Sequence, residues 1–392
     1  MKAGIITFHF PYNCGAVLQC LALQTQLEKL GAQAFVINYK PWYHQNRYTP
    51  VKNPVYYAGK LLHKPAPGDT QKTLLRRAAG GFARTVYSWR KYGEMAPRDR
   101  AFSQFRKRYL HETRVYRTLG TLKRRPPEAD LYIAGSDQLW NVKLTDNQPD
   151  HAYFLDFGND RVHRYTFSIG VFLTGTQEEK QELSGLLKRF QTISLREETY
   201  LPAIREASGG AIPLRQDLDP TFLLTAEEYE PYLCKRTLET EPFILTYTMP
   251  NKSQLSVYIT AKRLAKKKGI KIIDISGNPN DSHKYIPDNR TSGPDEFLWY
   301  VKHAQYVVTN SFHGTAFSVI FRKQFTVIPH TITGNRVSDL LKRLSLQDRV
   351  RTSPDDANGV WDRAIDYTAT EQALDQLRAE SREYLRGCVS QN

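Results

Sequence analysis

Cysteine is scarce in this sequence of 392 residues. The chain contains only Cys14, Cys20, Cys234 and Cys388, and no two of them form a C-x-x-C pair. Disulfide frameworks and structural zinc sites both need closely spaced cysteines, so the sequence argues against both. The His, Asp and Glu positions show no metal-ligand spacing either. We therefore expect neither a metal nor a bound cofactor.

Long apolar runs are also missing. No stretch reaches the 18 or so apolar residues that indicate a membrane-spanning helix, and the opening MKAGIITFHFPYNCG is typical of a first strand and not of a cleavable signal. We expect a cytoplasmic protein. The hydrophobic content of 40% is enough to build cores, and the length predicts about two to three domains.

Acidic residues are too few to balance the basic ones. The chain has 55 Lys and Arg against 40 Asp and Glu, which gives a formal net charge of +15. This excess favours an anionic partner, which is either nucleic acid, an acidic membrane face or a phosphorylated substrate. The sequence contains no known nucleic-acid-reading module, so we do not expect nucleic acid as the partner.

The first 39 residues predict a strand, a helix and a second strand. Ala3–Phe8 and Ala34–Tyr39 are apolar and strand-like, whereas Ala16–Leu30 has apolar residues at helical spacing. A βαβ start of this kind favours a parallel sheet and the α/β class. The loop before the helix lacks the G-x-G-x-x-G pattern of a dinucleotide site. It is either a substrate loop or an ordinary turn capped by Asn13.

Residues 41–127 interrupt this pattern with an insertion rich in Tyr, Lys and Arg. Within it, Leu74–Tyr92 and Phe102–Leu110 predict two basic helices, interrupted by Gly80-Gly81. The aromatic and aliphatic side of these helices suits contact with anionic lipid headgroups or with a lipid-linked pyrophosphate. Alternatively, that side packs on the core and the cations simply face water.

The sheet resumes at Asp130–Ala134, which is followed by a loop of small and polar residues from Gly135 to Asn141. Glycine and small residues let the backbone approach a ligand closely. Asp137 is the candidate acid–base group in this loop. Its alternative role is to cap the next turn.

Two further strands, Arg164–Gly170 and Thr192–Leu195, flank an amphipathic helix over Gln177–Phe190. Arg196 follows the second strand, so it lies at the carboxyl edge of the sheet. A guanidinium group there suits a carboxylate or a phosphate held by two parallel hydrogen bonds. The alternative is that Arg196 only pairs with one of the two glutamates that follow it.

A charged connection over Thr225–Thr240 marks the predicted domain boundary. We assign residues 1–225 to a first domain, residues 226–365 to a second α/β domain, and residues 366–392 to a last helix that braces the first domain. The second domain begins with a strand, a helix and a strand over Phe243–Thr248, Ser253–Lys268 and Lys271–Ile275.

The stretch Tyr306–Phe325 predicts a buried strand followed by a helix over Thr315–Phe321. His313 lies in the polar turn between them, where open α/β sheets hold ligands and the amino end of a helix favours anions. Lys323 follows the helix and adds a fixed positive charge. A lone histidine in an apolar stretch also has a structural interpretation, as a side chain of the core.

Six motifs, taken in order, resemble the polysaccharide pyruvyl transferase family. They span most of the chain outside the insertion and read Asn13-Cys14-Gly15, Gly135-Ser136-Asp137-Gln138-Leu139-Trp140, Ser194-Leu195-Arg196-Glu197-Glu198, Asp219-Pro220-Thr221-Phe222-Leu223-Leu224, Gly293-Pro294-Asp295-Glu296-Phe297 and Thr309-Asn310-Ser311-Phe312-His313-Gly314. The resemblance implies an α/β fold with two Rossmann-like domains facing across a cleft, as in the GT-B glycosyltransferases. It also implies transfer of pyruvate from phosphoenolpyruvate to a sugar as a ketal.

The family resemblance and the residues together predict a site. His313 and Asp137 are the catalytic candidates, with the first domain on the acceptor side and the second on the donor side. One position departs from the family, whose members often have Arg or Lys two residues before the motif histidine, where this chain has Ser311. The predicted donor-binding residues are Arg196, Lys323, Asn310, Ser311, Gly314 and Thr315, and the predicted acceptor-binding residues are Asn13, Gly15, Ser136 and Gln138.

The implied partners are phosphoenolpyruvate and a sugar or lipid-linked oligosaccharide acceptor for a capsule or exopolysaccharide. The basic insertion predicts peripheral contact with the inner face of the cytoplasmic membrane. Because a fold does not fix a function, two alternatives stay open. One is a GT-B-type glycosyltransferase that uses a nucleotide sugar, and the other is a non-catalytic anion-binding relative.

Overall fold

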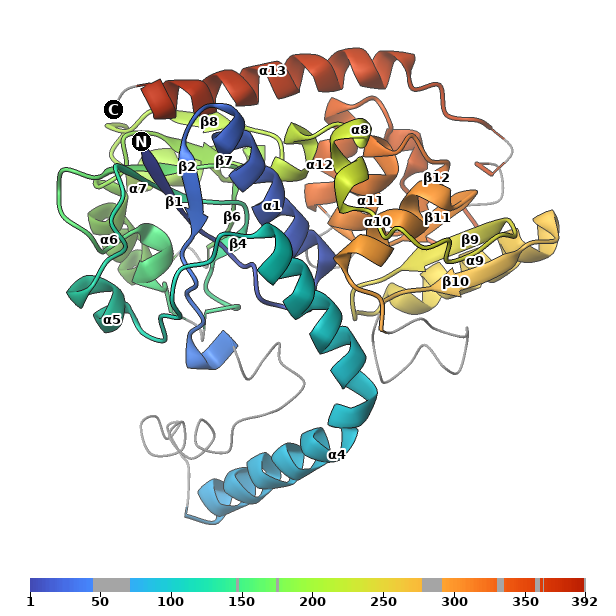
Figure 1. Ribbon diagram of the computed structural model, residues 1–392, viewed down its shortest axis with the longest axis horizontal. Coiled ribbons are helices and arrows are strands. Elements are labelled where there is room, and N and C mark those ends of the chain that lie inside the picture. Colours follow the sequence, from blue (N-terminus) through green and yellow to red (C-terminus); the bar gives the residue numbers. More distant parts are fainter. Residues whose placement is uncertain are drawn as a thin grey trace.

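The computed structural model describes residues 1–44, 71–145, 148–173, 176–276, 291–329, 335–356, 360–361 and 363–390. In this part of the chain the strands pair in parallel and form three four-stranded sheets. Two sheets belong to an amino-terminal half and one to a carboxyl-terminal half (Figure 1). The predicted α/β class with two Rossmann-like halves is confirmed.

Each sheet is built from short strands of three to five residues. The first has the order β2-β1-β3-β5, from β1 (Lys2–Ile6), β2 (Gln33–Val36), β3 (Leu131–Ala134) and β5 (His163–Thr166). The second has the order β4-β6-β7-β8, from β4 (Asp137–Asn141), β6 (Ile169–Phe172), β7 (Ile193–Leu195) and β8 (Leu214–Gln216). The third has the order β10-β9-β11-β12, from β9 (Phe243–Tyr247), β10 (Lys271–Asp274), β11 (Tyr306–Thr309) and β12 (Phe325–Val327).

The first two sheets adjoin because the chain bends from one into the other twice. β3 leads into β4 through Gly135 and Ser136, and β5 leads into β6 through a similar bend. Asp137 and Ser168 have φ values of 78° and 52° at these bends, a region that is costly for residues other than glycine. The Thr7 hydroxyl donates to the Ser136 carbonyl at 2.8 Å and fixes the first bend.

Two buried helices lie where the halves meet. α1 (Cys14–Lys29) follows β1, and Figure 1 shows it between the two halves. α11 (Phe312–Ile320) follows β11 and is buried along its whole length. Because each helix follows a parallel strand, both begin at the carboxyl edge of a sheet. Besides the long helices α4 (Gln71–Tyr109) and α13 (Thr368–Ser390), the structure contains α5 (Leu119–Arg124), α6 (Gln177–Leu187), α7 (Leu201–Ala207), α8 (Ala226–Tyr229), α9 (Gln254–Lys268), α10 (Pro294–His303) and α12 (Asn335–Arg343).

The last helix, α13 (Thr368–Ser390), runs across both halves (Figure 1). Its residues Leu385 and Cys388 are buried in the core of the first sheet. The Tyr384 hydroxyl donates to the Thr166 carbonyl at 3.0 Å, and Arg378 Nε donates to the Phe222 carbonyl at 2.8 Å. α13 therefore packs on the amino-terminal half.

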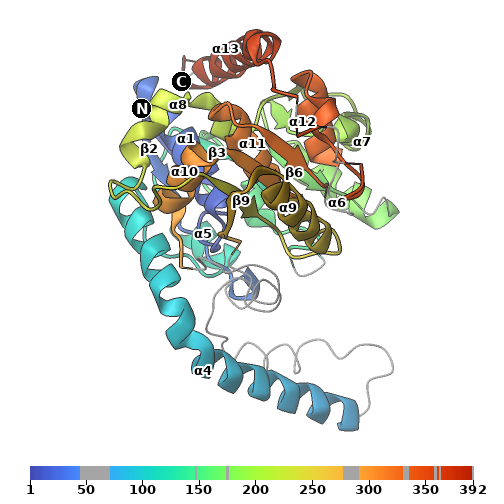
Figure 2. The same ribbon diagram turned by 90° about the vertical axis from the view of Figure 1, so that its right-hand side faces the viewer.

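The insertion contains one long helix, α4 (Gln71–Tyr109), so the prediction of two helices was wrong. Gly80-Gly81 does not interrupt it. The carboxyl-terminal part of α4 packs on the body through Phe102 and Phe105, which are buried, while the amino-terminal part projects away from the body (Figures 1 and 2). Pro97 lies inside α4 and has no N–H for the Gly93 carbonyl, which favours a bend. Residues 45–70 of the insertion lie outside the described part.

Two further predictions need correction. Residues 135–141 do not form a continuous loop, because Asp137 begins β4. His313 does not lie in the turn before the helix, because α11 begins at Phe312 and includes it. Among the described helices, none combines the length and the apolar character that crossing a membrane requires.

Candidate active site

The amino ends of α1 and α11 meet between the halves. Asn13 caps α1 by accepting a hydrogen bond from Gly15 N at 3.0 Å, and Ser311 caps α11 by accepting one from Gly314 N at 3.3 Å. The His313 ring packs directly on Gly15, where a Cβ atom would lie 2.0 Å from His313 Cγ. Only glycine fits there. Because helix amino ends carry partial positive charge, this meeting point favours an anion.

His313 is buried, with 6% of its surface exposed. Its Nε2 atom has no hydrogen-bond partner among the described residues and lies 3.8 Å from Asp219 Oδ2. Burial lowers the pKa of the His313 imidazole below its usual value. The carboxylates of Asp219 and Asp137 oppose this shift, whereas the guanidinium groups of Arg196 and Arg336 add to it. The imidazole is therefore mainly neutral at pH 7 and able to accept a proton.

Asp219 is the centre of a buried polar network. Its Oδ1 atom accepts hydrogen bonds from Thr221 N at 3.1 Å and Thr221 Oγ1 at 2.9 Å. Its Oδ2 atom accepts from Ser136 Oγ at 2.8 Å and from Arg196 Nη1 at 3.0 Å. Burial acts to raise the pKa of Asp219, but His313 and Arg196 outweigh it, so this pKa is lowered. The charged carboxylate ties the ends of β3 and β7 together.

Arg196 follows β7 and is 5% exposed. Its guanidinium pairs with Glu197 at 3.2 Å and with Asp219 at 3.0 Å, and it stands over the Phe312 ring at 4.9 Å. Burial acts to lower the pKa of Arg196, but the two carboxylates raise it above its usual value. Arg196 Nη2 and Glu197 Oε2 are buried without hydrogen-bond partners in the described part of the chain. Arg196 thus pairs with Glu197 and still keeps an N–H group for a ligand.

α12 brings a second guanidinium group to the same place. Arg336 Nε lies 3.8 Å from Glu197 Oε1, and the Arg336 guanidinium stands over the Phe312 ring at 5.8 Å. The Gln138 carboxamide lies 2.8 and 2.9 Å from its terminal nitrogens. Burial, together with the charge of Arg196, lowers the pKa of Arg336 to about 10. Arg336 therefore stays cationic at neutral pH.

Asp137 lies beside this network. Its carboxylate accepts a hydrogen bond from Gln138 N at 2.8 Å. Because β4 and not a turn follows Asp137, the alternative role of capping the next turn is wrong. Its charge also acts to raise the pKa of Arg196 and of His313. A Cβ atom on Gly170 would lie 2.7 Å from Arg196 Nη2 and 2.9 Å from the Asp137 carbonyl. The bend after β3 thus brings Asp137 close to the guanidinium group.

Several predicted donor-site residues hold the backbone around His313. The Asn310 side chain accepts from Met249 N at 2.6 Å and donates to the Met249 carbonyl at 2.9 Å, so it joins the loops after β9 and β11. The Thr315 hydroxyl donates to the Ser311 carbonyl at 2.9 Å. Gly314 lies against Thr309, whose Oγ1 atom would be 2.4 Å from a Cβ. These residues position the first turn of α11.

Lys323 lies at the other end of α11. Its ammonium group donates to the Lys302 carbonyl at 2.8 Å, at the end of α10. Burial lowers the pKa of Lys323. The structure therefore does not bring Lys323 together with His313 and Arg196.

The sequence alone predicts no site role for Asp219, Phe312 or Arg336, and it predicts Glu197 only as a partner of Arg196. Asp219, Phe312 and Glu197 stand inside motifs of the family resemblance, which is the signal that was available. Arg336 stands in an amphipathic helix and has no such signal. Among the described residues, no group of three His, Cys, Asp or Glu side chains is arranged to hold a metal ion.

The fold and the site define an α/β protein with paired cations and a buried imidazole between two Rossmann-like halves. The sequence model of the family described as "Polysaccharide pyruvyl transferase" matches residues 13–331. The chain belongs to the polysaccharide pyruvyl transferase family, and it is a transferase. The predicted family is thereby confirmed. No curated protein sequence matches the chain.

Solved structures with a similar chain path include enzymes that bind nucleotide sugars. The UDP-GlcNAc 2-epimerase from Neisseria meningitidis bound to UDP-GlcNAc is 10% identical, with 100% of both chains covered and a TM-score of 0.48. S. aureus MnaA with UDP is 10% identical, with 97% of this chain and 96% of that chain covered and a TM-score of 0.49. Arabidopsis thaliana UGT89C1 with UDP-L-rhamnose is 11% identical, with 97% and 94% covered and a TM-score of 0.42. No functional conclusion follows at this level of similarity.

The contact between Gly15 and His313 makes a testable prediction. In Gly15→Ala the new methyl group would occupy the position of the imidazole, so we expect the free energy of unfolding to fall by about 1–3 kcal/mol, as for other overpacked sites. The matched control is Gly185→Ala in α6, where nothing lies within 4 Å of the added atom. It should leave stability unchanged or raise it by up to about 1 kcal/mol. Equal stability of the two variants in denaturant unfolding would contradict the packing described.

Proposed function

We propose that this transferase moves pyruvate from phosphoenolpyruvate onto a sugar of a cell-surface polysaccharide precursor and forms a ketal. One observation carries the proposal. Arg196 Nη2, Glu197 Oε2 and His313 Nε2 are all buried around Asp219 without hydrogen-bond partners in the described part of the chain. Buried polar atoms are rarely left unpaired. The anionic oxygens of phosphoenolpyruvate would accept a hydrogen bond from the Arg196 N–H group. A sugar hydroxyl would donate a hydrogen bond to Glu197 Oε2 or to His313 Nε2.

The donor's carboxylate and phosphate need several N–H groups. Arg196 Nη2, the Arg336 guanidinium and the amino end of α11 are suited to supply them. Both guanidinium groups stand over the ring of Phe312, at 4.9 and 5.8 Å from its centroid. The charge of Arg196 is largely neutralised by its two carboxylates, and Arg336 adds a second guanidinium group, 3.8 Å from Glu197. Family members often carry Arg or Lys two residues before the motif histidine, where this chain has Ser311. The Arg336 guanidinium takes the place of that cation.

The reaction needs two proton acceptors and two proton donors. Two sugar hydroxyls form C–O bonds to the central carbon of the donor and lose their protons. One proton is gained by the methylene carbon, which becomes a methyl group, and one leaves with the phosphate when its C–O bond breaks. The mainly neutral His313 imidazole is suited to accept a hydroxyl proton, and Asp137 is suited to orient the hydroxyl. Arg196 and Arg336 assist departure of the phosphate by stabilising its charge.

Replacing His313 tests this assignment. In His313→Ala we expect phosphate release from phosphoenolpyruvate in the presence of acceptor to fall at least about a hundredfold, the usual scale for a lost proton-transfer group. The control is His111→Ala, which removes an exposed imidazole that pairs with Glu28 at 3.0 Å. It should keep wild-type turnover. Wild-type turnover of His313→Ala, in protein that melts normally, would refute the role of His313.

The pH dependence of kcat/KM gives a second expected result. The free protein has a His313 pKa below the usual value of about 6.5, so the proton-accepting form predominates above that pH. Activity should therefore persist down to about pH 6.5 and fall as the pH drops further and the imidazole is protonated. An acidic limb with a midpoint well above 6.5 would contradict a His313 that accepts the proton.

We also propose that the acceptor is lipid-linked and that α4 contacts the membrane. Phe82, Tyr87, Trp89 and Tyr92 of α4 are 67, 61, 57 and 37% exposed. Phe82 and Trp89 are seven residues apart and share one face of the helix. The part of α4 that carries these residues projects from the body (Figures 1 and 2). Exposed aromatic residues on a protein with a net charge of +15 suit an anionic lipid surface.

Vesicle flotation tests the membrane contact. The wild-type protein should float with anionic vesicles at low salt, and Phe82→Ser/Trp89→Ser should reduce vesicle binding at least about tenfold, since burying one such side chain contributes about 1.5–3 kcal/mol. The matched control is Leu255→Ser/Ile259→Ser in α9, which removes two apolar side chains that are 45 and 37% exposed. Its binding should equal that of the wild type. Wild-type protein that stays in solution would remove the proposal.

A further inference from the structure

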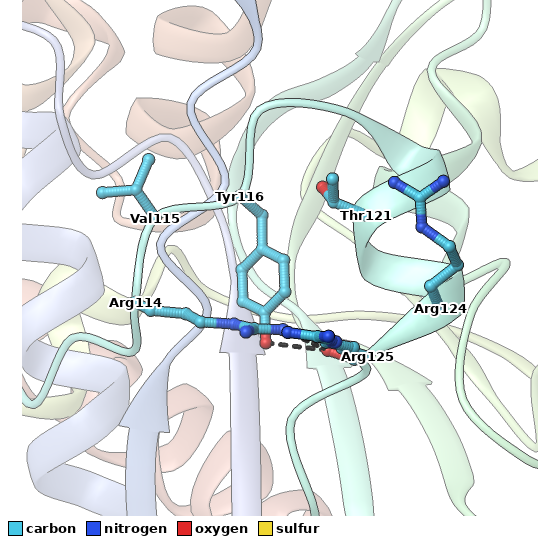
Figure 3. A pocket seen from close by; sticks show the side chains of 6 residues that line it. All are labelled: Arg114, Val115, Tyr116, Thr121, Arg124 and Arg125. Carbon is cyan, nitrogen blue, oxygen red and sulfur yellow. Dashed lines mark hydrogen bonds between the residues drawn. The ribbon is translucent and has the colours of Figure 1, made fainter.

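A second concave site lies on the amino-terminal half beside α5. It is a pocket of about 350 Å³ lined by Arg114, Val115, Tyr116, Thr121, Arg124 and Arg125. Figure 3 shows the Arg114 and Arg125 side chains near the tip of the Tyr116 ring and Arg124 on the far side of Thr121. We call it the arginine pocket. It shares no lining residue with the site around Asp219.

The backbone of the arginine pocket is held in place by the sheet edge and by two hydrogen bonds. Residues 112–116 run parallel to the chain after β2, with bridges from Val36 to Glu112 and from Tyr39 to Tyr116. The Tyr116 hydroxyl and Arg114 Nη2 both donate to the Arg125 carbonyl, at 3.0 and 3.2 Å. The Arg114 guanidinium also stands over the Tyr116 ring at 5.0 Å. The pocket is therefore preorganised in the absence of a ligand.

The charges of the arginine pocket are not neutralised. Within the part of the chain that the structure describes, none of Arg114, Arg124 and Arg125 makes an ion pair with a carboxylate, whereas the nearby Lys123 and Arg189 both pair with Asp156. None of the residues that line the pocket is acidic. Three guanidinium groups around one concavity suit a ligand with several anionic oxygens, because guanidinium binds phosphate oxygens through paired N–H groups.

The arginine pocket and Ser136 lie at one edge of the first sheet. The pairs of Ile5 with Val36 and of Ile6 with Ala134 place Tyr39 and Ser136 at the same level, just past the ends of the strands. Residues 112–116, β2, β1 and β3 follow one another across this edge. Three strand spacings of about 4.8 Å separate the pocket from Ser136 by roughly 14 Å. A ligand longer than one sugar is needed to reach both places.

We propose that the arginine pocket binds the diphosphate group of a diphosphate-linked saccharide while the saccharide reaches the site at Asp219. This inference rests on the proposed function, because it names the chemical class of its acceptor. Diphosphate supplies clustered anionic oxygens, which suit three guanidinium groups that pair with no carboxylate in the described part of the chain. The distance between the two places makes the acceptor an oligosaccharide, with the reacting sugar remote from the diphosphate.

Calorimetry with inorganic diphosphate tests the pocket on its own. We expect Arg124→Gln/Arg125→Gln to weaken diphosphate binding at least about tenfold, since hydrogen bonds between charged groups are among the stronger ones. The control is Arg161→Gln/Arg205→Gln, which removes the same charge from exposed positions outside the pocket. It should bind as the wild type does. Equal affinities of the two double variants, or no binding by the wild type, would overturn the proposal.

Kinetics separates the pocket from the chemistry. With one oligosaccharide offered with and without its lipid diphosphate, Arg124→Gln/Arg125→Gln should raise KM at least about tenfold for the diphosphate-linked form only. A failure of the wild type to release phosphate from phosphoenolpyruvate with any acceptor would remove the proposed function, while the calorimetry would still decide whether the pocket binds diphosphate. If Arg124→Gln/Arg125→Gln lost binding to anionic vesicles but kept the wild-type affinity for diphosphate, the pocket would be assigned to lipid headgroups and the proposal would be overturned.

Discussion

The carboxylate of Asp219 is the constraint on which the site depends. It is almost fully buried and accepts hydrogen bonds from Ser136, Thr221 and Arg196, with the His313 imidazole 3.8 Å away. Removing one partner of a buried charge pair typically costs 3–5 kcal/mol, so these groups hold one another in place. Because Asp219 and Glu197 engage only part of the Arg196 guanidinium, one of its N–H groups is left for a ligand.

The same site joins the two halves of the molecule. His313 lies in the first turn of α11 in the carboxyl-terminal half, and its ring packs on Gly15, in the first turn of α1 in the amino-terminal half. The bend that carries Ser136 and Asp137 lies at the carboxyl end of β3. Asp137 has a positive φ there, which strains the backbone. Strained backbone of this kind is often found at functional sites. The contact between the halves and the candidate site therefore involve the same residues.

Local patterns predicted much of the fold and part of the site. The strand before His313 and the strand before Arg196 are short apolar runs, so their carboxyl ends could be located from the sequence. Lys323 was grouped with His313 by closeness in sequence, but the nine residues of α11 span roughly 14 Å at about 1.5 Å per residue. Asp219 follows a three-residue strand, and Arg336 comes from a distant helix. Only the tertiary fold brings these two to the site.

The central claim is that the unpaired nitrogens around Asp219 face the reacting groups of phosphoenolpyruvate and its acceptor. A crystal structure with phosphoenolpyruvate tests it most directly. The account predicts a carboxylate or phosphate oxygen at about 2.7–3.2 Å from Arg196 Nη2, with the central carbon of the donor on the side of His313 Nε2. Phosphoenolpyruvate bound elsewhere, with ordered water alone satisfying both nitrogens, would contradict it.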